Sequence, residues 1–320
     1  MIEQLDGAQR VIVRALLEPV VGSTFQPTGF PDLGAAEFER PGEDGGPPTR
    51  AVLVESVQSL ANHLEGVGWN APEREPHPAI KELPYIEVRD PEGAFLTSSR
   101  TEPHRLAGAY VKDATIDRQS VEQWMIGELG VEKGKPTDWQ SVYRAIFELD
   151  PLCLVHGVFF SDPDWSEFGN PKVRRAITAV IEAHGVRPVV SGGVKRDDVR
   201  PTAGGEGRDA KGGYGFVPFG RTEYAAERIE LTASVDLEQI RGYGLAGERT
   251  QLLTLVALWE LASLLDGGLR LRTACDLERS GVEIRRPKDL ALPEVEELEA
   301  AIATLKVDVE HPGARVVVWK

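Results

Sequence analysis

The chain has 320 residues, of which 41% are hydrophobic and 27% charged, a composition typical of a globular protein rather than a disordered or fibrous one. Its formal net charge of -15 excludes nonspecific polyanion binding over the whole surface. The cysteines, Cys153 and Cys275, are too few for a disulfide framework or metal cluster, which favours a reducing compartment. The amino terminus lacks the apolar core of a signal peptide, and the most apolar run, 252–265, is too short to cross a bilayer. We therefore expect a cytoplasmic protein without a membrane partner.

In the first half of the chain, polar and apolar residues alternate over 9–20, which predicts a strand. A Gly- and Pro-rich connection over 22–48 predicts a flexible loop. Apolar residues at helical spacing predict a helix over 50–67, capped by Thr49. Short strands are predicted at 85–89 and 94–98, and an irregular helical region at 116–148 with a break at 134–136.

In the second half, the compact apolar run CLVHGVFF at 153–160 suits a buried central strand. Pro171 indicates the first turn of a helix over 170–184. Lys172, Arg174 and Arg175 would lie in that first turn, where the helix dipole favours anions, so a bound phosphate is a plausible neighbour. The other predicted elements are strands at 187–192, 227–236 and 269–275, an edge strand at 314–319, and helices at 249–266 and 293–305. This interleaving predicts an α+β domain of the β-α-β-β-α-β type with large insertions.

Basic residues are concentrated in one part of this acidic chain. Residues 171–221 hold ten Lys and Arg against five acidic residues. Within them, the segment 190–224 is rich in glycine and contains Tyr214 and Phe216. Glycine allows close backbone approach, cations neutralise phosphates, and aromatic rings stack on unpaired bases. The segment is either an ordinary solvated surface loop or an arm that contacts a single strand.

A second glycine-containing segment, GSTFQPTGF at 22–30, follows the first predicted strand. Its backbone amides and small hydroxyls offer a grip on a sugar-phosphate chain, and its aromatic rings offer wedges between bases. It is equally consistent with a structured turn packed by its own phenylalanines. The sequence leaves these two interpretations open.

Catalytic signatures are weak. His156 lies within an apolar run and is more typical of a core side chain than of a base. His104, between two arginines, suits a phosphate or partner contact better than a general base. The pair Asp197-Asp198 is more typical of a solvated turn than of a cation site. Recognised metal, phosphate-loop, dinucleotide and nucleophile-elbow motifs are absent, so neither a metal nor a cofactor is expected.

Several motifs together resemble one family. They are GSTFQPTGFPDLG (22–34), LVESVQSLANHLE (53–65), LVHGVFF (154–160), RAITAVIEA (175–183), VPFGRTEY (217–224), IRGYGL (240–245) and LRLRTACDLE (269–278). In this order they resemble the RNA-binding backbone subunit of the type I-G (formerly I-U) CRISPR Cascade complex, a Cas-seven-type member of the RAMP superfamily. The part from residue 279 onward carries no matching motif.

The resemblance implies a single RAMP-type domain over 1–320, with an RRM-like, ferredoxin-like palm and large insertions that include a thumb-like arm. The loop 22–48, the basic arm 190–224 and a C-terminal extension 279–320 would be its additions. It implies a non-enzymatic subunit that polymerises head to tail along crRNA. The implied partners are crRNA, the target DNA strand paired to it, other copies of the chain and other Cascade subunits.

Under this hypothesis, particular residues are expected to contact RNA. The contacts should come from loops, because the predicted sheet strands carry no RNP-like aromatic pair on which bases could stack. The expected RNA-binding residues are Phe25, Gln26, Thr28, Arg100, His104, Arg105, Lys172, Arg174, Arg175, Lys195, Arg196, Arg208, Lys211, Tyr214 and Phe216. Two alternatives remain: a RAMP-type endoribonuclease using His104 or Asp32, and a small-molecule enzyme closed by the Gly-rich segment as a lid.

Overall fold

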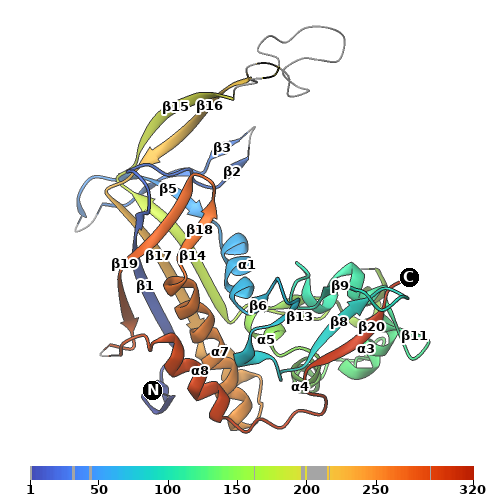
Figure 1. The fold of residues 1–320 in the computed structure, drawn as a ribbon. Helices are drawn as coiled ribbons and strands as arrows, with labels where there is room; N and C mark the ends of the chain where they lie inside the picture. Colours follow the sequence, from blue (N-terminus) through green and yellow to red (C-terminus); the bar gives the residue numbers. More distant parts are fainter. Residues whose placement is uncertain are drawn as a thin grey trace.

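The computed structural model describes the chain except residues 1, 31–32, 43–44, 162, 196–198, 200–214, 216 and 289. It is a mixed α+β fold with three parts (Figure 1). A large curled sheet carries helices on one face, a long two-stranded hairpin projects from one end of that sheet, and a smaller sheet with its own helices lies to the side.

The large sheet has seven strands, and every described pairing in it is antiparallel. In spatial order these are β18 (Leu269–Arg272), β19 (Cys275–Arg286), β1 (Arg10–Pro19), β17 (Arg228–Asp236), β14 (Ile177–His184), β5 (Thr49–Glu55) and β4 (Glu37–Arg40). The predicted alternation in β1 is confirmed, since Val11, Val13 and Ala15 are fully buried while their neighbours are not.

Two helices cover the buried face of this sheet. Helix α1 (Val57–Val67) begins at the cap Ser56, whose hydroxyl accepts a hydrogen bond from the Ser59 amide, and it packs against β14 and α7. Helix α7 (Gly247–Asp266) is buried almost all round, as its sequence predicts. Helix α6 (Leu237–Gly242) follows β17, and helix α8 (Val295–Thr304) packs on α7.

The projecting hairpin consists of β15 (Arg187–Lys195) and β16 (Val217–Ala225), which pair in register over nine residues each. It lies between β14 and β17 in the chain and extends away from the large sheet (Figure 1). Its base is tied to the body by a bridge between Phe25 and Tyr224. Val190 is 84% exposed, so β15 has little protein packed against it.

The smaller sheet runs β11 (Gln119–Ser120), β10 (Thr115–Ile116), β20 (Ala314–Val318), β8 (Tyr85–Arg89) and β9 (Phe95–Ser98). Its helices are α2 (Ala109–Lys112), α3 (Val121–Leu129), α4 (Trp139–Leu149) and α5 (Leu152–His156). Short strand pairs complete the fold: β2 (Gly29–Phe30) with β3 (Gly34–Ala35), β6 (Trp69–Asn70) with β7 (Glu75–Pro76), and β12 (Val158–Phe159) with β13 (Lys172–Val173).

The helix predicted over 170–184 is wrong, because this segment forms β13 and β14. Ile177, Ala179 and Ile181 are buried and the residues between them are not, which is the period of two of a strand. The cations Lys172 and Arg174 are therefore not at a helix N-terminus. The apolar run 153–160, predicted as a buried strand, begins in the short helix α5, turns at Gly157, whose φ is +81°, and continues as β12.

Two smaller predictions also change. The predicted helix over 50–67 is strand β5 followed by α1, because the apolar residues 51–54 are extended and largely buried in the sheet before Ser56 starts the helix. The predicted edge strand at 314–319 is β20, which lies in the middle of the smaller sheet and pairs in parallel with β8. The carboxyl-terminal part of the chain thus completes a sheet begun more than 200 residues earlier.

Candidate nucleic-acid interface

An exposed surface with cations and aromatic rings lies around the strand pair β12 and β13. Phe159 and Lys172 are paired across it, and the Lys172 Nζ lies 4.9 Å from the centroid of the Phe159 ring. Phe159 is 45% exposed, so its ring is accessible to a ligand. We refer to this pair and the two pockets that adjoin it as the β12–β13 surface.

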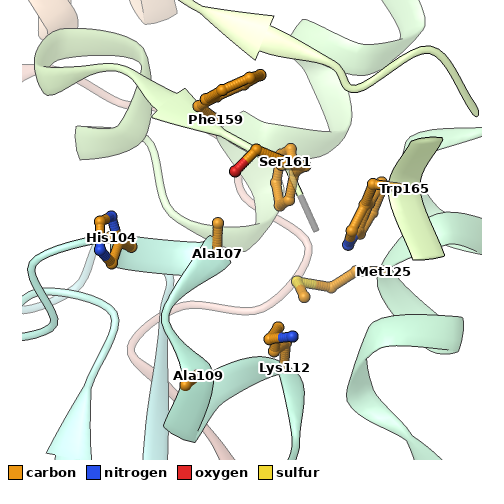
Figure 2. Close-up of a pocket in the computed structure, with 9 residues that line it drawn as sticks. His104, Ala107, Ala109, Lys112, Met125, Phe159, Ser161 and Trp165 are labelled. Atoms are coloured by element: carbon orange, nitrogen blue, oxygen red, sulfur yellow. The ribbon is translucent and has the colours of Figure 1, made fainter. Parts of the chain in front are cut away.

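The first pocket, the His104 pocket, has a volume of about 240 Å³. Figure 2 shows Phe159 and Ser161 on one wall, with His104 and Trp165 at opposite sides and Lys112 below. Trp165 is buried and packs on Phe160 with ring centroids 4.5 Å apart, so both rings are held within the core behind this wall. The pocket therefore combines a fixed aromatic wall with two exposed polar residues, His104 and Ser161.

The second pocket, the Trp139 pocket, has a volume of about 310 Å³ and lies on the other side of Lys172. Its walls come from helix α4, the β13 segment and helix α6. The lining residues are Trp139 and Tyr143 of α4, Lys172, Val173 and Arg174 of the β13 segment, and Gln239 and Tyr243 at α6. Trp139 is 39% exposed, and its ring centroid lies 5.8 Å from that of Tyr143.

The β12–β13 surface is positive although the chain is acidic. Among the described residues that line the two pockets there is no carboxylate. Lys172 and Arg174 are exposed, and neither forms an ion pair within the described part of the chain. Two uncompensated cations beside exposed rings can neutralise phosphate groups while the rings stack on bases.

Hydrogen bonds hold the floor of the Trp139 pocket in place. The Gln239 amide nitrogen donates to the Arg174 carbonyl at 2.6 Å and to the Tyr243 hydroxyl at 2.7 Å, and that hydroxyl donates to the Leu154 carbonyl at 2.8 Å. The Tyr243 ring lies 4.6 Å from Tyr143, and burial raises the pKa of Tyr243. Tyr243 is therefore a neutral hydrogen-bonding residue that fixes the pocket wall.

The arginines Arg100 and Arg105, predicted as RNA contacts, are buried instead. The Arg100 Nε donates to Asp150 at 2.9 Å, and the Ser99 hydroxyl donates to the same carboxylate at 2.6 Å. Arg105 forms an ion pair with Glu65 at 2.5 Å and donates to the Gly157 carbonyl at 3.0 Å. These arginines join the smaller sheet to α1 and α5, so their charges are used inside the protein and are not available to a phosphate.

Phe25, predicted to stack on bases, is also buried. Its ring is 1% exposed and its backbone pairs with Tyr224, so it packs into the core. The neighbouring Gln26 and Thr28 are half-buried, and their amides donate to the carbonyls of Ala274 and Val54. The segment that follows β1 is thus a structured turn between the hairpin base and the large sheet, which corrects the prediction of Phe25 as a base wedge.

The remaining predicted contacts fall into three groups. His104, Lys172 and Arg174 lie together on the β12–β13 surface. Arg175 is half-buried and donates to the Val57 carbonyl, and burial followed by the nearby Arg105 lowers its pKa. Lys195 is exposed at the end of β15, distant along the hairpin. Arg196, Arg208, Lys211, Tyr214, Phe216 and Asp32 lie outside the described residues.

Sequence reasoning missed Phe159, Trp139, Tyr143, Gln239 and Tyr243 as site residues. Trp139 follows the helix cap Asp138, whose carboxylate accepts hydrogen bonds from the Gln140 and Ser141 amides, so it begins a helix at the surface. The position of Trp139, an aromatic residue in the first turn of a surface helix, is the sequence feature that could have indicated a binding residue. Tyr243 lay within a motif of the resemblance, but nothing local linked it to a residue 100 positions earlier.

The described residues contain no group of three or more His, Cys, Asp or Glu side chains able to hold a metal ion. None of the helices found in them combines the length and apolar character needed to cross a bilayer.

These observations define a mixed α+β protein with a projecting hairpin and an exposed cationic, aromatic surface. The family model described as CRISPR-associated protein GSU0053 (Cas_GSU0053) matches residues 11–188, more than half of the chain. The chain therefore belongs to this CRISPR-associated family. No curated protein matches its sequence. A solved structure described as a CRISPR RNA-guided surveillance complex, pre-nicking, is similar with a TM-score of 0.44 and 13% identity, over 86% of this chain and 75% of that chain.

Proposed function

We propose that this chain is a crRNA-binding backbone subunit of the Cas-seven type in a type I-G CRISPR interference complex. Copies would polymerise head to tail along the RNA and present it for pairing with target DNA. The observation that carries the proposal is the β12–β13 surface, where Lys172 and Arg174 lie uncompensated beside exposed rings in a protein of net charge -15. Membership of a CRISPR-associated family supports a role in such a complex.

The order of elements also supports the proposal. Along the chain the elements β1, α1, β14, β17, α7 and β19 occur in this order, with other elements between them. Their strands lie side by side as β19-β1-β17-β14. This order supports the proposal of an RRM-like palm of the β-α-β-β-α-β type, in which the smaller sheet and the hairpin would be insertions. The β15–β16 hairpin is the candidate for the thumb-like arm, because it projects from the palm with little protein packed on it (Figure 1).

The charge distribution gives a physical account of how RNA would be held. Phosphates would be attracted to the β12–β13 surface and repelled by the acidic remainder of the chain, which limits RNA to one path. Lys172 and Arg174 read no sequence, because they contact the backbone, and base pairing with the target supplies specificity. In this account the protein holds RNA without cleaving it.

A gel-shift and cleavage assay with labelled single-stranded RNA of increasing length tests the proposal. We expect binding that weakens with salt, further protein copies on longer RNA, and no shortening of the RNA. Absence of binding at low salt would contradict the proposal. Shortening of RNA by the wild type but not by His104→Ala would instead identify an endoribonuclease.

A further inference from the structure

An apolar groove lies where the end of α8 and the segment 305–312 meet the body of the protein. It has a volume of about 550 Å³, and its lining comes from η3 (Pro78–Ile80) and the residues after it, from α7, from α8 and from the segment that follows α8. All of its lining residues are apolar except Glu82 and Asp308. None of them belongs to the β12–β13 surface, so the groove is a separate site.

The first part of the segment after α8 is extended and has unpaired backbone donors. Leu305, Val307 and Val309 are half-buried against the core, whereas Lys306 and Asp308 between them are exposed, which is the period of two of extended backbone. The backbone amides of residues 306–309 donate no hydrogen bond within the described part of the chain. Such backbone is the kind of edge to which another extended segment adds through main-chain hydrogen bonds.

The two polar residues of the groove are both acidic. Glu82 and Asp308 are exposed, and neither carboxylate forms an ion pair within the described residues. The described lining holds no cation, since Lys306 is not among its residues. These charges repel the phosphates of RNA and favour a ligand that carries lysine or arginine.

We propose that this groove receives an extended segment of a partner protein in which apolar side chains are flanked by lysine or arginine. The apolar side chains would enter the groove, the backbone would pair with residues 306–309, and the basic side chains would lie near Glu82 and Asp308. The inference goes beyond the proposed function and does not depend on it, because the site uses no residue of the β12–β13 surface. It gives the chain a protein-binding face in addition to its cationic one.

The test measures the fluorescence anisotropy of a labelled ten-residue peptide that alternates arginine with valine and leucine. One control peptide carries glutamate in place of arginine, and the other carries serine in place of valine and leucine. The wild type should bind the first peptide at least about tenfold more tightly than either control, because only this peptide satisfies both the carboxylates and the apolar lining.

Two variants of α8 test whether the peptide occupies the groove. Ala303→Trp places an indole ring at an exposed position of the lining and should weaken the affinity for the first peptide by at least about tenfold. Ala300→Trp, at an exposed position of the same helix outside the lining, should keep the wild-type affinity. Thermal melting measures the stability of both variants.

A double substitution tests the charges. Glu82→Gln/Asp308→Asn removes both carboxylates with little change in size and should weaken binding of the first peptide about 2- to 30-fold. Glu296→Gln/Glu297→Gln, at exposed positions of α8 outside the lining, removes the same charge and should keep the wild-type affinity. Because Glu82 and Asp308 are exposed, this double variant tests the site even if Ala303→Trp is unstable.

Four results would overturn the inference. The wild type could bind none of the peptides, or it could bind both arginine peptides equally, which would show only a general attraction to an acidic protein. A loss of RNA affinity in a stable Ala303→Trp variant would place RNA, and not a protein segment, in the groove. Self-association of the wild type that Ala303→Trp abolishes, measured by sedimentation, would identify a second copy of the chain as the occupant. By contrast, wild-type protein that binds the peptide but no RNA would contradict only the proposed function.

Discussion

The arginines Arg100 and Arg105 and the cations Lys172 and Arg174 are alike in sequence and opposite in the structure. The first pair is buried against Asp150 and Glu65 and joins separate parts of the fold. The second pair is exposed beside aromatic rings without a carboxylate partner among the described residues. A cation with a buried carboxylate partner therefore stabilises the fold, whereas a cation without one is available to a ligand.

The largest expected effect is a loss of stability when the buried ion pair of Arg100 and Asp150 is broken. Asp150→Ala leaves the Arg100 guanidinium buried without its counterion and removes the acceptor of Ser99. We expect the free energy of unfolding to fall by about 3–5 kcal/mol, measured by urea denaturation. The matched control, Asp113→Ala, removes an exposed carboxylate that is paired with Lys112, and it should change stability by less than about 1 kcal/mol. A mild effect of Asp150→Ala would contradict the assignment of the Asp150 carboxylate as the counterion that Arg100 needs inside the fold.

A smaller loss of stability is expected when the fully buried pair of His156 and Glu260 is broken. The His156 Nε2 and Glu260 Oε2 atoms of this pair lie 2.7 Å apart. Burial alone would lower the pKa of His156, but the Glu260 carboxylate outweighs it and raises that pKa. The protonated imidazole therefore stabilises the fold fully below pH 6.5, its unfolded value, and this contribution is lost as the pH rises through the higher folded value. Glu260→Gln should cost about 1–3 kcal/mol near pH 6 and less at pH 8.

Urea denaturation at the two pH values measures this difference, with the exposed Glu296→Gln as the control that keeps the wild-type profile. A cost of Glu260→Gln that does not change with pH would contradict the assignment of a proton to the pair.

The smallest effect concerns His184, at the end of β14. Burial, followed by the charges of Arg40 and Arg228, lowers its pKa. The unfolded chain then takes up a proton below pH 6.5 that the folded chain resists, so stability falls as the pH drops through that range. His184→Asn should reduce this slope by up to about 1.4 kcal/mol per pH unit, measured from urea midpoints at pH 7.5 and 5.5. Thr178→Ala, exposed on the same strand, should keep the wild-type slope.

Elements with one clear period could be predicted from sequence. The alternation of β1 and β17 and the all-round apolar helix α7 are properties of neighbouring residues, so local patterns define them. The segment 173–181 was misread because Val173, Ile177, Val180 and Ile181 fit a helical stripe almost as well as a strand. The structure shows the strand period of two, because Ala179 and Ala183 are buried in the sheet together with Ile177 and Ile181.

Only part of the candidate site could be predicted from the sequence, and the physical reason differs from the one that limits the prediction of strands and helices. Lys172 and Arg174 could be identified from their charge alone. The burial of Arg100 depends on Asp150, 50 residues later, and that of Arg105 on Glu65, 40 residues earlier. The Trp139 pocket is formed by helices about 100 residues apart. Contacts between residues so far apart in the chain depend on the tertiary fold, and local sequence patterns cannot predict them.

The most direct test of the account measures RNA affinity against salt concentration for Lys172→Ala/Arg174→Ala. The matched control is Lys288→Ala/Lys306→Ala, which removes two exposed cations outside both pockets. The first variant should bind RNA more weakly, with a slope of log affinity against log salt reduced by about 1.4, at wild-type stability. The control should keep the wild-type slope. Equal slopes in the wild type and both variants would contradict the assignment of RNA to the β12–β13 surface.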